Sequence, residues 1–310
     1  MFRPLFCLAM LVACTPSVEA PHANVSVTLS LDPKANELPE GLAVRGDEVF
    51  LGLAMAQKVI RIADGEQSEF ATYPSLPQGK GFLTGLSVAP DGSLWAGLAS
   101  YDEKTTTGVY KVGSDGGNAT LFATAEGMVL PNDIAWMNGG DALVSDSAAG
   151  VIWRITPDGE ASEWFADPNL KGDPLVCEPD ELGFAIGANG LDFGPDDALY
   201  IANTDRAQIF RIDIEEGNPK TMTALNETNC ALLEGADGIV AGPKGVVVAV
   251  NRTDQLSIVS YDGAVSSWSE DDALDFPASI APYKDGFYIS NFGLITASSG
   301  TARPGLLFVK

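Results

Sequence analysis

Apolar and polar residues alternate with a period of two in many short stretches of the chain, and turn residues separate these stretches. Residues 190–212 show the pattern as strand, turn, strand, loop and strand, with Gly-Pro-Asp-Asp forming the first turn. Residues 86–124 repeat the same order. Alternation of this kind favours β-strands over helices. The pattern therefore predicts an all-β protein built from one repeated unit.

A short sequence at the start of each unit marks the repeat. We call its first residue the slot residue, and the six slot residues are Glu40, Thr84, Asn132, Asn189, Asp237 and Ala278. Successive slots are separated by 44, 48, 57, 48 and 41 residues. A period of about 45 residues with four short strands per unit is typical of β-propellers. We predict a six-bladed propeller over residues 37–310, closed through residues 37–40 or through the segment before them.

The slot residues suggest a chemistry, because equivalent positions of all blades meet near one axis. Four slots carry a side-chain oxygen: Glu40, Asn132, Asn189 and Asp237. Hard oxygen ligands suit Ca²⁺, with Mg²⁺ as the alternative ion. The alternative interpretation is local, since Asn and Asp before a strand often serve only a turn. Four such residues at one repeated position favour the calcium site.

The net charge of the chain limits the classes of partner that it can bind. Lys and Arg number 18 against 42 Asp and Glu, which gives a net charge of −24. A nucleic-acid partner is disfavoured, because no basic surface can form from this composition. The only histidine is His22, outside the predicted propeller, so a histidine-based triad in the folded domain is excluded. We expect a monomer that acts on a small molecule.

The N-terminus has the features of an export signal. Residues 1–13 combine Arg3 with an apolar run too short to span a bilayer. Leu-Val-Ala-Cys at residues 11–14 resembles the lipobox of bacterial lipoproteins, so Cys14 would be lipidated and residues 14–36 would form a tether. We therefore expect an exported cell-envelope lipoprotein, in the outer membrane if the source is Gram-negative, that touches the membrane only through its lipid. Cleavage after Ala20, with a periplasmic or secreted product, is the alternative.

Two further cysteines lie within the propeller. Cys177 belongs to an insertion at residues 167–187 that is rich in proline and acidic residues, and Cys230 comes late in the next unit. An even pair of cysteines in an exported protein predicts a disulfide between neighbouring blades, with two buried free thiols as the alternative. The insertion could cover the mouth of the channel.

The six units and their slots resemble the calcium-dependent six-bladed propeller hydrolases. That superfamily includes the senescence-marker/gluconolactonase proteins, diisopropyl fluorophosphatase and the paraoxonases, and the resemblance covers about 270 residues from Glu37 onward. It implies a catalytic metal held by four residues from blades one, three, four and five, which here are Glu40, Asn132, Asn189 and Asp237. Thr84 and Ala278, in blades two and six, would supply no ligand.

The resemblance also has limits. Sugar-lactonase relatives carry an arginine two residues before the blade-three asparagine, and Leu130 stands there instead, so a more apolar lactone or ester is expected. The paraoxonases use a histidine dyad that this chain lacks. We expect Leu130 and Thr84 to contact the substrate. Asp133, Asp146, Asn203 and Asn251, next to the slots or at the ends of second strands, are candidates to support the ligands.

The sequence thus favours a calcium-dependent, gluconolactonase-like hydrolase of a lactone or ester. The ion would polarise the carbonyl group, and Asp237 would be both a ligand and the general base or nucleophile. A non-catalytic, envelope-anchored propeller that binds a ligand or protein partner is the first alternative, because a fold does not fix a function. A phosphotriesterase or an enzyme like strictosidine synthase is the second.

Overall fold

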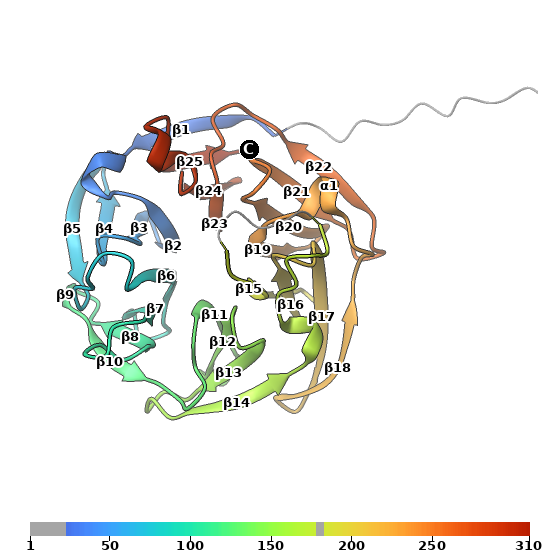
Figure 1. The fold of residues 1–310 in the computed structure, drawn as a ribbon. Helices are drawn as coiled ribbons and strands as arrows, with labels where there is room; N and C mark the ends of the chain where they lie inside the picture. Colours follow the sequence, from blue (N-terminus) through green and yellow to red (C-terminus); the bar gives the residue numbers. More distant parts are fainter. Residues whose placement is uncertain (1–22, 178–182) are drawn as a thin grey trace, which may run out of the picture.

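The computed structural model describes residues 23–177 and 183–310 of the chain. These residues form six sheets arranged in a ring around a central channel, so the predicted six-bladed propeller is confirmed (Figure 1). The predicted signal peptide at residues 1–13, the predicted lipidation site Cys14 and the first part of the predicted tether lie outside the described residues. No helix within the described ranges has the length and apolar character needed to span a membrane.

Each blade is an antiparallel sheet whose four strands lie side by side, in order from the channel outward. The innermost strands are β2 (Pro39–Arg45), β6 (Gly81–Val88), β11 (Pro131–Trp136), β15 (Ala188–Phe193), β19 (Ala236–Gly242) and β23 (Pro277–Tyr283). The second strands are β3 (Glu48–Leu53), β7 (Leu94–Ser100), β12 (Ala142–Asp146), β16 (Leu199–Asn203), β20 (Gly245–Val250) and β24 (Gly286–Asn291). The third strands are β4 (Lys58–Ala63), β8 (Gly108–Val112), β13 (Val151–Ile155), β17 (Gln208–Glu215), β21 (Gln255–Val259) and β25 (Gly305–Val309).

The outer strands complete the blades. They are β5 (Glu66–Thr72), β10 (Thr120–Ala123), β14 (Ala161–Ala166), β18 (Asn218–Ala224), β22 (Val265–Ser269) and β1 (Val25–Ser30). A two-residue strand, β9 (Gly117–Asn118), adds a parallel partner to β5. The helical segments are short: α1 (Cys230–Leu233) and the 3₁₀ turns η1 (Pro33–Ala35), η2 (Pro168–Leu170) and η3 (Thr296–Ser299).

The ring closes through the segment that precedes the first blade. Strand β1 pairs with β25, with Val25 opposite Val309, so the sixth blade contains both an early and a late part of the chain (Figure 1). Of the two closures that the sequence left open, the structure shows the second. The propeller therefore begins within the segment that the sequence assigned to the tether. Closure removes the exposed sheet edges that an open ring would present.

The core lies between neighbouring blades rather than at the channel. All five residues of β12 are buried, because the second strand of a blade is covered on both faces by other sheets. Aromatic rings fill the gap between the second and third blades, where Trp95 packs against Phe122 and Trp136 at centroid distances of 4.5 and 4.7 Å. This packing fixes where each inner strand begins, and therefore where each slot residue lies.

The inner and second strands of every blade share an irregularity at the slot. In all six blades their pairing register shifts next to the slot residue. A β-bulge changes the direction in which the local side chains point. The repeated bulge thus places the slot residues of all blades at equivalent positions around the channel.

Candidate functional site

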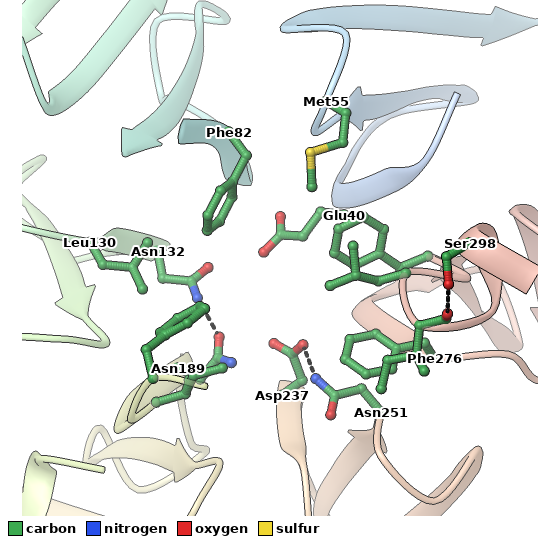
Figure 2. A pocket seen from close by; sticks show the side chains of 15 residues that line it. Glu40, Met55, Phe82, Leu130, Asn132, Asn189, Asp237, Asn251, Phe276 and Ser298 are labelled. Carbon is green, nitrogen blue, oxygen red and sulfur yellow. Dashed lines mark hydrogen bonds between the residues drawn. The ribbon is translucent and has the colours of Figure 1, made fainter. Parts of the chain in front are cut away.

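A cavity of about 490 Å³ opens where the inner strands begin and the second strands end (Figure 2). Its polar lining residues are Glu40, Asn132, Asn189, Asp237, Asn251 and Ser298. Its apolar lining residues are Met55, Phe82, Leu130, Phe184, Ile186, Phe276, Phe292, Leu294 and Ile295. The four slot residues with side-chain oxygens all lie here, and each is only 4–7% exposed. The structure therefore brings together residues that are up to 197 positions apart in sequence, from 40 to 237.

Glycine after the slot allows the inner strands to approach one another. A Cβ atom added at Gly190 would lie 2.3 Å from the backbone oxygen of Asp237, and one added at Gly41 would lie 2.5 Å from the backbone oxygen of Thr84. Real side chains cannot occupy such positions without moving the backbone. The glycines that follow Asn189 and Glu40 in the repeat therefore set the width of the ring at the cavity.

The remaining two slots do not contribute to the lining. Thr84 is fully buried, and its hydroxyl donates a hydrogen bond of 2.7 Å to the carbonyl oxygen of Pro131 in the next blade. The predicted substrate-binding residue Thr84 thus joins blades two and three instead of lining the cavity. Ala278 is also fully buried. Leu130, the other predicted substrate contact, does line the cavity.

A polar residue directly after the second strand orients the slot residue in each of blades three, four and five. Asn132 Nδ2 donates to Ser147 Oγ at 3.1 Å, and Asn189 Nδ2 donates to Thr204 Oγ1 at 2.9 Å. The two hydroxyls donate in turn to backbone carbonyls of the next blade. Asn132 Nδ2 also donates to Asn189 Oδ1 at 2.7 Å, so the two amides are linked directly (Figure 2).

In blade five the same position is Asn251, which the sequence did select. Its Nδ2 donates to Asp237 Oδ2 at 2.8 Å (Figure 2). Ser147 and Thr204 were missed, although they follow the predicted Asp146 and Asn203 by one residue. The signal that could have found them is their common place in the repeat, directly after the second strand.

Asp146 and Asn203 lie one residue earlier and serve the loops instead. Adjacent residues at a strand end point to opposite sides. Asp146 accepts hydrogen bonds from the backbone of Val129 and Leu130 and from Trp153 Nε1. Its carboxylate therefore holds the loop that carries Leu130.

Asn203 has the corresponding role in the fourth blade. Its Nδ2 donates to the carbonyl oxygens of Asn169 and Lys171, in the insertion that precedes β15. Asp133, the fourth predicted supporting residue, accepts backbone hydrogen bonds from Ile134 and Leu191. Asp133 thus connects β11 to β15 next to the cavity.

A disulfide and two interactions of Asp205 fix the insertion against its neighbours. Cys177 and Cys230 form the predicted disulfide, which joins the insertion to α1. Asp205 is fully buried, accepts a hydrogen bond from the backbone of Ile186 and pairs with Arg252 at 2.8 Å. The insertion thereby presents Phe184 and Ile186 to the cavity.

The two carboxylates of the cavity are strongly perturbed. Burial raises the pKa of Asp237 to about 8. Burial, and then the nearby carboxylates of Asp237 and Asp133, raise the pKa of Glu40 well above its usual range. Among the described residues that line the cavity, none is lysine, arginine or histidine. Both shifts have the same cause, which is that negative charge is expensive where water is excluded.

A cation would satisfy this arrangement. Glu40 Oε2 is buried and has no hydrogen-bond partner in the structure, although buried polar atoms almost always have one. The donor set of two carboxylates and two amides matches the oxygen ligands that Ca²⁺ prefers. Over residues 23–177 and 183–310, no group of three or more His, Cys, Asp or Glu side chains is placed to hold a metal. The set fits an ion only if Asn132 and Asn189 take part.

Comparison with known proteins agrees with the resemblance seen in the sequence. The model of the family described as "SMP-30/Gluconolactonase/LRE-like region" matches residues 33–180, which span the first three blades. The search of curated proteins finds no match. The predicted relationship to gluconolactonase-like propellers is thus confirmed, and its sequence support comes from the N-terminal part of the chain.

Several solved structures share the fold. A calcium-binding protein, regucalcin, from Agrobacterium tumefaciens is 17% identical, with a TM-score of 0.64 over 91% of this chain and 92% of its own. A gluconolactonase from Xanthomonas campestris is 15% identical, with a TM-score of 0.63 and coverages of 93% and 89%. Virginiamycin B lyase from Staphylococcus aureus is 18% identical, with a TM-score of 0.57 and coverages of 88% and 83%. At these identities the likeness shows the fold alone.

Proposed function

We propose that this protein, which carries the SMP-30/gluconolactonase signature over residues 33–180, is a calcium-dependent hydrolase of a lactone or related ester. The observation that carries the proposal is the pairing of two buried carboxylates, Glu40 and Asp237, in one cavity whose described lining includes no cationic side chain. Such a site favours a bound cation. The calcium-binding protein and the gluconolactonase among the structures with this fold support the choice of ion and reaction.

Four residues would hold the ion: Glu40, Asn132, Asn189 and Asp237. Ser147 and Thr204 accept hydrogen bonds from the amide nitrogens of Asn132 and Asn189. Asn189 Oδ1 accepts a further hydrogen bond of 2.7 Å from Asn132 Nδ2, and a bound ion would replace this contact. When bound, the cation would polarise the carbonyl group of the substrate and favour the charge that develops on its oxygen. An opposite charge nearby lowers a carboxyl pKa, so the metal-bound form would keep Asp237 ionised.

Asp237 is the residue placed to do the chemistry. Asn251 donates to Oδ2 of its carboxylate and fixes its orientation, while the other oxygen, Oδ1, would face the substrate. Oδ1 would take a proton from the attacking water and pass it to the alkoxide that leaves as the acyl C–O bond breaks. In the alternative, Oδ1 would itself attack the carbonyl carbon and displace the alkoxide, and water would then hydrolyse the acyl-aspartate. The surrounding burial excludes bulk water, which strengthens every charge interaction with the reacting group.

The test combines ion binding with turnover. Thermal unfolding of the metal-stripped protein is followed during titration with Ca²⁺, for wild type, Asp237→Asn and the control Asp158→Asn in the exposed turn between β13 and β14. We expect Ca²⁺ to raise the unfolding midpoint of wild type and of the control but not of Asp237→Asn, because only native-state binding stabilises. Hydrolysis of a lactone and ester panel should stop with EDTA and fall by about 10²- to 10⁴-fold in Asp237→Asn. Hydrolysis that is indifferent to both changes would overturn the proposal.

The proposal for the cellular location rests on the sequence alone. We propose a lipoprotein of the bacterial envelope, anchored through Cys14. Wild type should then appear in the membrane fraction with a lipid-modified N-terminus by mass spectrometry, and Cys14→Ser should not. Recovery of unmodified wild type cleaved after Ala20 would instead indicate a periplasmic or secreted protein.

A further inference from the structure

The cavity is divided into a polar side and an apolar side. The polar side consists of the four oxygen-bearing slot residues and Asn251, and the apolar side consists of the nine apolar lining residues. Figure 2 shows the polar side chains toward the centre of the cavity, with Met55, Phe82, Leu130 and Phe276 around them. The apolar residues come from blades one, two, three and six and from the insertion before blade four. A substrate held at the polar side by its reacting group must therefore rest the remainder of the molecule on hydrocarbon.

The apolar side recurs at defined positions of the repeat. The residue two places before the slot is Phe82 in blade two, Leu130 in blade three and Phe276 in blade six, and all three line the cavity. The residue directly after the second strand, which orients the slot residue in blades three to five, is Phe292 in blade six. Phe276 and Phe292 pack edge to face with their centroids 6.0 Å apart. The wall is thus part of the architecture of the repeat.

Polar groups that could recognise substrate hydroxyls are scarce on this wall. Ser298 is the only hydroxyl residue among the described residues that line the cavity, and its Oγ donates to the carbonyl oxygen of Ile295 at 3.3 Å. A site that binds a sugar supplies a partner for each hydroxyl, because an unpaired buried polar group is costly. A polyhydroxylated lactone would leave its hydroxyls unpaired here.

The mouth of the cavity continues the apolar character. Phe184 is 43% exposed and Ile295 is 37% exposed, although both line the cavity. Large apolar side chains on this rim would offer a hydrocarbon chain a continuous surface from the cavity to its opening.

We propose that the cavity selects a lactone or ester that carries a hydrophobic alkyl or acyl chain, with the carbonyl group at the polar side and the chain along Phe276, Phe292 and Leu294. This inference rests on the proposed function for the reaction but not for the binding of the chain. Leu294 and Ile295, which follow the sixth blade's second strand, are the specificity residues. Both residues belong to the segment between β24 and β25, and neither is a slot residue.

Binding is tested first, with 2-alkylcyclopentanones of increasing chain length, which resemble alkyl lactones but cannot be hydrolysed. Their affinities for the intact protein are measured by calorimetry in Ca²⁺ and in EDTA. Each added CH₂ should tighten binding about fourfold until the cavity is filled, because a buried methylene contributes about 0.8 kcal/mol. Affinity that does not change with chain length would overturn the inference.

Two loop variants locate the effect, and each is first checked by thermal unfolding. Leu294→Asn and Ile295→Asn should each weaken binding of the longest ketone about tenfold or more and leave the shortest ketone unchanged. The control Leu121→Asn changes a comparably exposed side chain on the outer strand β10 and should have no effect. Equal losses for short and long ketones, or an equal loss in the control, would contradict the assignment of these residues.

Hydrolysis then separates this inference from the proposed function. The rate constants kcat/KM for a series of alkyl lactones are compared with that for gluconolactone. Hydrolysis that rises with chain length supports both ideas, and hydrolysis that favours gluconolactone leaves the proposed function standing but sinks the inference. Chain-dependent binding of the ketones without hydrolysis of any lactone would support the inference and overturn the proposed function.

Discussion

Blades four and six use the same backbone frame and give the cavity opposite characters. In blade four the slot residue is Asn189, and Thr204 follows the second strand. In blade six these positions hold Ala278 and Phe292. Both blades have the same backbone hydrogen bond at this point. The N–H of Thr204 donates to the carbonyl oxygen of Gly187, and the N–H of Phe292 donates to the carbonyl oxygen of Phe276. In these two blades, the side chains at two positions therefore decide whether the blade gives the cavity polar or apolar groups.

The comparison shows that different hydrogen bonds orient the polar residues and support the apolar residues of the cavity. In blades three and four the slot amide is oriented by a hydroxyl that also donates to the next blade, and in blade five Asn251 orients Asp237. The apolar residues of blade six are supported by Asp275. Its carboxylate accepts hydrogen bonds from the Thr296 hydroxyl and from the backbone N–H of Arg303. Because the two networks share no residue, each can be disturbed without the other. The predictions below use this independence.

The largest expected effect concerns the disulfide that joins the insertion to α1. The bond between Cys177 and Cys230 closes a loop with a sequence separation of 53 residues. The chain-entropy model assigns about 4 kcal/mol of stability to a loop of that length. The double variant Cys177→Ser/Cys230→Ser should lose about that much in chemical unfolding, and reduction of wild type should give the same loss. A loss below about 1 kcal/mol would contradict the entropic argument.

The second prediction concerns the close contact of blades four and five. Gly190→Ala would place Cβ 2.3 Å from the backbone oxygen of Asp237, so the two inner strands must separate. We expect a destabilisation of about 3 kcal/mol, together with weaker Ca²⁺ binding. Gly113→Ala is the matched control, because no atom lies within 4 Å of its added Cβ. Urea unfolding of both variants measures the difference, and equal stabilities would show that the strands yield freely.

The third prediction is a pH dependence of the polar side alone. Burial raises the pKa of Asp237 from 3.8 to about 8. Between these values the metal-free folded protein binds a proton that the unfolded chain does not bind. Its stability should therefore fall as pH rises through this window.

A cation competes with that proton, so Ca²⁺ affinity should rise with pH. We expect affinity to be at least about tenfold higher at about pH 8.5 than at about pH 6.5, as measured by the Ca²⁺-dependent shift of Tm. Asp237→Asn should remove this contribution and should be more stable than metal-free wild type at the higher pH. Binding of the alkyl ketones in EDTA should vary much less with pH. The same Ca²⁺ affinity at both pH values would argue against Asp237 as a ligand.

The smallest effects come from a matched pair of substitutions, one on each side. Thr204→Val removes the hydroxyl that orients Asn189 and should weaken Ca²⁺ binding about tenfold, whereas Thr204→Ser should retain it. Thr296→Val removes a hydrogen bond to Asp275 and should cost about 1–2 kcal/mol in stability without changing Ca²⁺ binding. Calcium titration of both variants tests the separation, which fails if Thr296→Val weakens ion binding as much as Thr204→Val does.

The sequence predicted correctly the features that each repeated unit encodes in its own residues. It predicted the six blades, because strand alternation and turn residues recur in every unit. It selected Glu40, Asn132, Asn189 and Asp237, which the structure brings to one cavity, and it paired Cys177 with Cys230. Their roles as ligands stay a prediction. In these cases each residue type is informative at its own position.

The sequence was a poor guide to side-chain direction at the strand ends. Asp146 and Asn203 were expected to support the ligands, yet they hold loops, while the neighbouring Ser147 and Thr204 contact the slot residues. A step of one residue along a strand moves the side chain to the opposite face, and the repeated bulge determines which residue faces the slot. Thr84 was expected to contact substrate, but its hydroxyl joins two blades.

By itself, the sequence determined the number of units, the strand order within each unit and the residue at every slot, because short-range alternation and turn chemistry encode these features. Only the tertiary structure decided that Val25–Ser30 closes the sixth blade, that Phe82, Leu130 and Phe276 line one cavity, and that this cavity holds two buried carboxylates but no cationic side chain in its described lining. These features depend on distances between residues far apart in the chain. Such distances are set by the closure of the ring and by the packing between blades.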